Sequence, residues 1–168
     1  MANNNYFELP DLIELNSVGG DFHAFLEFVY NEFKKEFIDQ KPVFRGQRLG
    51  LKKNPVSQEK EATFWHMTSE GEDENNRNPD IRRMERIKWP ACIINGSEHD
   101  YLKVWENSRG TKNNILIFHE GENFVVVLRK GNGYLLPWTA YLVEHSARKR
   151  KLMEEYKSYI NAKSAQQS

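Results

Sequence analysis

Residues 115–119, ILIFH, and residues 124–128, FVVVL, are the most strand-like runs of this chain and set its architecture. Both are rich in β-branched and aromatic residues, and each has the length of a single strand. The polar segment HEGEN at residues 119–123 lies between them and suits a hairpin with a longer loop. We therefore predict two antiparallel strands joined by this loop.

A second turn signal follows the hairpin. The segment Gly131–Gly133 predicts a tight turn, after which the run Tyr134–Val143 pairs back onto the sheet. Pro137 cannot donate a hydrogen bond within a sheet, so it requires an edge position or a bulge. Upstream, Tyr101–Trp105 fits a strand or a turn. These runs together predict an antiparallel meander.

The clearest helix in the sequence precedes this sheet. Asp21 is a good N-cap, and apolar side chains then recur at helical spacing to about Asp39. We interpret this aromatic stripe as core, and its use as a face for a partner or a second subunit stays open. The stripe consists of Phe22, Phe25, Leu26, Val29, Tyr30, Phe33 and Phe37.

Shorter elements fill the region between this helix and the sheet. Val43–Arg45 is a strand candidate, and Ala62–Thr68 fits either a short strand or a helical turn. Residues 69–79 are expected to form an exposed, mobile loop. Asp80 then caps a second helix, which Pro90 kinks or interrupts.

The order of these elements predicts the fold class. A last helix begins at Ser146 and runs to about Tyr159. Helices, then a meander, then a helix indicate an α+β fold, with N-terminal helices packed on a roughly four-stranded antiparallel sheet. We divide the chain into an arm and amphipathic helix over residues 1–40, a nuclease-like α+β domain over residues 41–160 and a flexible tail over residues 161–168.

The charge of the chain is balanced in total but not in distribution. The 168 residues carry 24 basic and 24 acidic side chains, so the formal net charge is zero. Residues 1–44 hold three lysines and eight acids (3 − 8 = −5), whereas residues 129–168 hold eight basic side chains and three acids (8 − 3 = +5). This asymmetry could create a basic face, or the two ends could simply attract each other.

Several functional classes are disfavoured by what the sequence lacks. The single cysteine, Cys92, has apolar neighbours and is interpreted as a buried structural thiol. No apolar run approaches the about 20 residues of a membrane helix, and the first residues lack a signal-peptide pattern, so we expect a cytoplasmic protein. There is no phosphate-binding glycine loop and no zinc-like spacing of His and Cys, so we expect no metal and no cofactor.

His66 has the most suggestive setting of the five histidines. It lies in FWHMT at residues 64–68, and an aromatic setting can hold an imidazole near the neutral pKa that a general acid or base needs. The basic pair Arg82–Arg83 follows. Thr139 and Tyr141 are two residues apart, so on a strand they share a face. Such a set suits phosphodiester cleavage without a metal, and a hydrogen-bonded core role for His66 is the alternative.

Five short motifs run in order through the chain: FWHMT at residues 64–68, DIRR at 80–83, IKW at 87–89, TAY at 139–141 and RKRKL at 148–152. In this order they resemble the phage-associated branch of the barnase–EndoU–colicin–RelE nuclease group, over roughly residues 43–157. Members of that group pack helices on a four-stranded antiparallel sheet and typically cleave RNA without a metal, and many are toxins or phage effectors. The resemblance implies the same fold and activity here.

The resemblance also implies roles for particular residues. His66 would be the general acid or base, and Arg82 or Arg83 would bind the scissile phosphate and stabilise its developing charge. Thr139 would hydrogen-bond the phosphate, and Tyr141 would stack a base or assist proton transfer. The cations expected to bind the substrate are Arg45, Arg83 and Arg148.

Three functional hypotheses stay open at this point. The first is a toxin or phage effector that cleaves RNA by transphosphorylation without a metal. The second is a non-catalytic binding or accessory protein of phage or mobile-element origin, which uses the aromatic stripe as a dimer or partner face. The third is a nucleic-acid-binding remnant of a nuclease fold. The expected partners are RNA and a protein inhibitor or partner, with no membrane.

Overall fold

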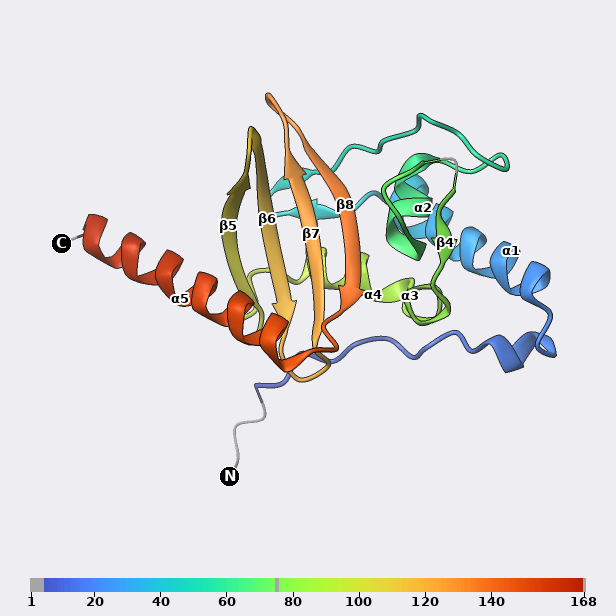
Figure 1. Ribbon diagram of the computed structural model, residues 1–168, viewed down its shortest axis with the longest axis horizontal. Coiled ribbons are helices and arrows are strands. Elements are labelled where there is room, and N and C mark those ends of the chain that lie inside the picture. The colour runs from blue at the N-terminus through green and yellow to red at the C-terminus, as the bar shows by residue number, and fades with distance from the viewer. Residues whose placement is uncertain (1–4, 75, 168) are drawn as a thin grey trace.

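The computed structural model describes residues 5–74 and 76–167 and has the α+β architecture predicted from the sequence (Figure 1). N-terminal helices pack on a four-stranded antiparallel sheet, and one long helix follows the sheet. Apolar clusters lie on both faces of the sheet, which is therefore the centre of the molecule. No helix in the described ranges is long and apolar enough to cross a membrane.

The sheet is a meander of four consecutive strands. These strands are β5 (Lys103–Arg109), β6 (Lys112–His119), β7 (Phe124–Lys130) and β8 (Leu135–Leu142), and their order in the sheet follows the chain. The two runs with the strongest strand pattern are β6 and β7, and they pair antiparallel as predicted. Side chains alternate along each strand, so every strand contributes to both faces.

β8 is an edge strand with a bulge. Its pairing register with β7 shifts between Val127 and Leu128, so Trp138 has no partner residue on β7. Both arrangements that accommodate Pro137, an edge position and a bulge, are present. The extra residue turns Trp138 toward the apolar cluster that also contains Tyr141.

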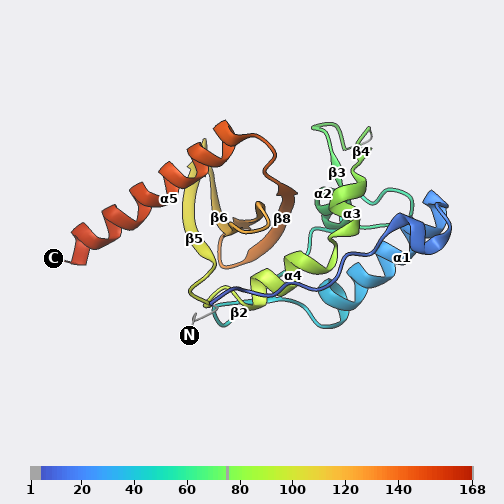
Figure 2. The ribbon, with the colours of Figure 1, turned by 90° about the horizontal axis from the view of Figure 1, so that it is seen from below.

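One face of the sheet is covered by the N-terminal part of the chain. Figure 2 shows α4 beneath the strands, where its apolar side chains join those of β6 and β7 in one cluster. The elements of this part are η1 (Leu15–Val18), α1 (Phe22–Phe33), η2 (Lys34–Asp39), α2 (Ala62–Thr68), α3 (Ile81–Glu85), α4 (Lys88–Asn95), the hairpin β1 (Val43–Phe44) with β2 (Gln47–Arg48), and the hairpin β3 (Ser69–Glu70) with β4 (Asn78–Pro79).

The predicted aromatic stripe packs inside the chain. The Asp21 carboxylate accepts a hydrogen bond from the Ala24 N–H and so caps α1, as predicted. Phe22 and Phe28 are the exposed large apolar side chains of α1, which the structure describes throughout. On this helix, a partner could therefore contact large apolar side chains only at these two positions. The buried members of the stripe are Phe25, Leu26, Val29, Phe33 and Phe37.

Two local predictions need correction. α3 ends at Glu85 and α4 starts at Lys88, so the break falls before Pro90 rather than at it. Pro90 lies in the first turn of α4, where a missing N–H costs little because that N–H would have no helical partner. The segment 69–79 is not simply an exposed loop, because its ends pair as β3 and β4 and Ser69 is fully buried.

The opposite face of the sheet is partly covered by α5 (Ser146–Gln167), which runs diagonally to the strands and packs on β5 (Figure 1). Leu152 is buried in a cluster with Trp105, and the ring of Tyr156 meets Trp105 edge-on with centroids 5.7 Å apart. The helix continues past its predicted end at Tyr159 to Gln167. α5 lies at the β5 edge, and α2 and α3 contact β8 at the other edge, so no helix of the described residues runs across the middle of this face, which we call the open face (Figure 1).

Candidate functional site

Trp138, the bulge residue of β8, is surrounded by three basic side chains. The guanidinium carbon of Arg129 lies 3.8 Å from the centre of its ring, and Lys52 Nζ lies 5.2 Å from the ring centre. The His66 ring meets Trp138 edge-on with centroids 5.0 Å apart. β7, the loop before α2 and α2 itself thus converge on one indole, whose electron-rich face attracts the cations.

Arg129 is placed to bind an anion. Its Nε donates a hydrogen bond to Asn114 Oδ1 at 3.0 Å, and it forms no ion pair with any carboxylate in residues 5–74 and 76–167. Burial lowers the pKa of Arg129, but the ordinary value is so high that the group stays charged. Because Nε is held by Asn114, the two terminal nitrogens can serve a bidentate ligand such as a phosphate.

A chain of hydrogen bonds across the sheet fixes Arg129. Asn114 Nδ2 donates to Asn107 Oδ1 at 3.1 Å, and Asn107 Nδ2 donates to Glu155 Oε1 at 2.8 Å. The same carboxylate oxygen accepts a hydrogen bond from Trp105 Nε1 at 2.7 Å. The network runs from α5 through β5 and β6 to β7, so the last helix is connected to the arginine.

His66 forms a hydrogen-bonded pair with Glu74, which lies in the loop between β3 and β4. His66 Nε2 is 2.7 Å from Glu74 Oε1. Burial lowers the pKa of His66, against the opposing effect of Glu74. For Glu74, burial acts to raise the pKa, but the hydrogen bond and charge of His66 and the charge of Lys52 outweigh it and lower the pKa.

The lowered pKa of Glu74 favours its ionised form. An ionised Glu74 carboxylate can only accept a hydrogen bond, so His66 Nε2 carries the proton. A neutral imidazole then has an unprotonated Nδ1, which is the nitrogen able to act as a base. We call the group of Lys52, His66, Glu74, Arg129 and Trp138 the Trp138 cluster.

Thr139 meets His66 through the backbone. Its Oγ1 donates a hydrogen bond to the His66 carbonyl oxygen at 3.1 Å, which ties β8 to α2. The contact helps to hold Trp138 beside the imidazole. The hydroxyl proton of Thr139 is used in this bond. In this arrangement Thr139 therefore has no proton left to donate to a phosphate, which is the role that the resemblance implies for it.

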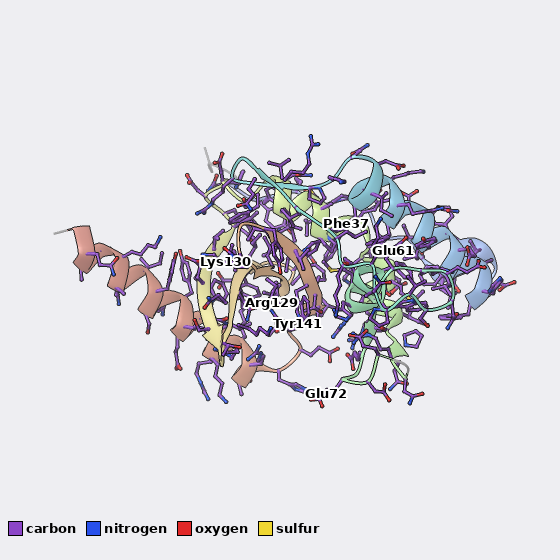
Figure 3. The ribbon with its side chains drawn as sticks, turned by 90° about the horizontal axis from the view of Figure 1, so that it is seen from above. Phe37, Glu61, Glu72, Arg129, Lys130 and Tyr141 are labelled. Atoms are coloured by element: carbon purple, nitrogen blue, oxygen red, sulfur yellow. The ribbon has the colours of Figure 1, made fainter. Side chains whose placement is uncertain are left out.

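Tyr141 marks a second cationic position along β8. Arg148 Nη2 donates a hydrogen bond to its hydroxyl at 2.9 Å, and the guanidinium carbon of Arg83 lies 5.6 Å from its ring centre. Arg83 donates to the Ser69 carbonyl oxygen at 2.9 Å and forms ion pairs with Glu70 and Asp80, so Arg148 supplies the positive charge at this position. Tyr141 and Arg129 both project to the side of the sheet on which α5 begins (Figure 3).

The remaining two candidate residues have other surroundings. Arg82 forms an ion pair with Glu144, which neutralises its charge beside Tyr141. Arg45 lies in the turn between β1 and β2, where its guanidinium carbon is 5.3 Å from the centre of the Phe44 ring, and it lines a separate pocket. The structure thus brings His66 together with Thr139. Arg82, Arg83 and Arg148 lie near Tyr141, and Arg45 lies away from both groups.

Four members of the Trp138 cluster did not stand out in the sequence: Lys52, Glu74, Arg129 and Trp138. Alternation along β7 could have found Arg129, because it falls two residues after Val127, which faces the α5 side of the sheet. Lys52 and Glu74 come from loops, and no periodicity reports where a loop places its side chains.

Comparison of the sequence with protein-family models and with curated proteins, and of the structure with solved structures, found no match. Within the described chain, no three His, Cys, Asp or Glu side chains are grouped so that they could hold a metal ion.

Proposed function

We propose that this protein binds single-stranded RNA across the open face of β7 and β8 and cleaves it by transphosphorylation without a metal. The Trp138 cluster is the observation that carries this proposal. It combines a lysine, a histidine–carboxylate pair and an arginine that has no carboxylate partner in the described ranges. Such a set supplies phosphate binding, charge stabilisation and proton transfer in one place.

RNA binding would use the two cationic positions along β8. Arg129 and Lys52 at one position, and Arg148 at the other, would attract the phosphate backbone. Trp138 and Tyr141 would offer ring surface to bases that are not stacked in a helix. Because duplex RNA hides its base faces, this combination favours a single strand.

In the cleavage step His66 would act as the base. Its Nδ1 would take the proton of a ribose 2′-hydroxyl, while Glu74 stabilises the imidazolium that forms. The 2′-oxygen would then attack phosphorus as the bond to the 5′-oxygen breaks, which leaves a 2′,3′-cyclic phosphate and a 5′-hydroxyl. Arg129 would stabilise the negative charge of the transition state, and Lys52 would give the leaving oxygen its proton.

The test is cleavage of a short end-labelled single-stranded RNA in the presence of excess chelator. We expect 2′,3′-cyclic ends and a loss of about 100-fold in rate for His66→Gln and for Arg129→Gln. Lys130→Gln removes a charge from the neighbouring residue on the opposite face of β7 and keeps the native rate. Cleavage that requires added metal, or that survives His66→Gln unchanged, would contradict the proposal.

RNA binding without cleavage is a second candidate, and the burial of His66 favours it. Its side chain is only 7% exposed, so little of the imidazole is accessible to a 2′-hydroxyl. Salt-sensitive binding of the same RNA that is lost in Arg129→Gln, with no cleavage products at any time, would select this candidate.

A further inference from the structure

A separate pocket of about 270 Å³ lies between the β1–β2 turn, the strands and α5. Its position relative to the Trp138 cluster follows from strand alternation, because Lys130 lines this pocket and the adjacent Arg129 projects to the opposite face. The pocket is thus on the other side of the sheet from the proposed RNA site. Its apolar wall is formed by Phe44, Val104, Ile115 and Leu135.

Three cations and one carboxylate surround this apolar wall. Lys130 Nζ lies 2.6 Å from Glu106 Oε1, so these two neutralise each other, and the Tyr159 hydroxyl donates to Glu106 Oε2 at 3.3 Å. Arg45 from the β1–β2 turn and Lys163 from α5 also line the pocket. Neither forms an ion pair within the described parts of the chain, which leaves a net charge of three minus one, or +2, at the pocket.

Arg45 and Lys163 both line the pocket. The hydrogen bond and charge of Tyr159 and the charge of Glu106 raise the pKa of Lys163, against a smaller opposing effect of the charge of Arg45. Like charges held near each other repel, and an anion placed between them would offset that repulsion. The pocket therefore combines an apolar wall with two cations that have no ion-pair partner among the described residues.

We propose that this pocket binds a small organic anion with a flat apolar body, such as an aromatic carboxylate. The ring system would lie against Ile115 and Leu135, and the acidic group would lie between Arg45 and Lys163. The volume limits the body to one or two fused rings. This site is independent of RNA cleavage, because it uses no residue of the Trp138 cluster.

The test uses two matched probes, 2-naphthoate and its neutral analogue 2-naphthalenemethanol, in a titration followed by NMR of the ¹⁵N-labelled protein. We expect saturable shifts for the amides of Val104, Ile115 and Leu135, and an affinity for the carboxylate at least about tenfold above that for the alcohol. Equal affinities for the two probes, absence of binding, or shifts centred on Trp138 and Arg129 would each overturn the proposal.

Paired variants then test the role of charge. Arg45→Gln/Lys163→Gln should lower the affinity for 2-naphthoate to that for the alcohol, whereas the affinity for the alcohol stays unchanged. Lys112→Gln/Lys157→Gln removes two other exposed charges and should leave both affinities at native values. Because all four side chains are exposed, the variants keep the native spectrum. An equal loss of naphthoate affinity in both pairs would contradict a specific anion site.

Discussion

The two faces of the sheet are built from the same strands, yet they differ in how completely they are covered. On the face toward α4, Phe124, Val126 and Leu128 of β7 are buried under the N-terminal helices, and Lys130 follows them at the end of the strand. On the other face, apolar Val125 and Val127 are followed by Arg129, and α5 covers only the β5 edge. Because successive side chains of β7 point to opposite faces, substitutions at the adjacent residues Leu128 and Arg129 should affect stability and ligand binding differently.

The largest expected effect is on the covered face. Phe124→Ala should lower the free energy of unfolding by about 3–5 kcal/mol, because the ring is fully buried and packs edge-on against Trp89 with centroids 5.2 Å apart. Urea denaturation measures this loss. Arg129→Ala on the same strand is the control and should cost only about 1–2 kcal/mol, mainly for the lost hydrogen bond to Asn114. Equal destabilisation by the two variants would break the comparison of the faces.

The next effect is on the open face and concerns RNA. Arg129→Gln should weaken binding of single-stranded RNA about tenfold and reduce the slope of log affinity against log salt by about 1, because one phosphate contact is lost. Binding measured over a range of salt concentrations gives both quantities. Lys130→Gln should change neither of them. If the two variants behave alike, bulk charge rather than the geometry of the open face binds the RNA.

A smaller effect should follow from loosening Arg129 without removing its charge. Asn114→Ala breaks the hydrogen bond to Arg129 Nε, so Asn114 is a positioning residue whose loss should slow RNA cleavage about tenfold. The salt slope of RNA binding should stay native because the guanidinium is still present. A changed salt slope with a native cleavage rate would show that Asn114 acts on binding alone.

Much of the fold could be predicted because it follows from local patterns. The strands around residues 115–119 and 124–128 show β-rich runs bounded by turn signals, and the cap at Asp21 depends on its near neighbours only. The position of the helix break could not be predicted in the same way. Proline is accepted in the first turn of a helix as well as at a kink, so Pro90 alone does not say which applies.

The candidate site depends on long-range geometry, which short motifs do not report. A motif gives the type of a residue but not which carboxylate neutralises it: Arg82 is paired with Glu144, whereas Arg129 has no such partner among the described residues. The central position of Trp138 results from a one-residue bulge and from the packing of α2 against β8. Both are properties of the assembled sheet.

The smallest expected effect tests a weak point in the helical layer. Burial raises the pKa of Glu36 from 4.5 to about 7, and its Oε2 has no hydrogen-bond partner. The folded state therefore favours the protonated carboxyl, and this contribution to stability is complete below about pH 4.5 and is lost as the pH rises through about 7.

Glu36→Gln resembles the protonated form, so it should be nearly neutral at pH 5 and stabilising by about 1 kcal/mol at pH 8, a value reduced by the partial exposure of the group. Urea denaturation at both pH values measures the difference, with the exposed Glu154→Gln as control. A gain that is the same at both pH values would mean that the helical layer tolerates the Glu36 charge, and that the covered face is less closed to water than its apolar side chains indicate.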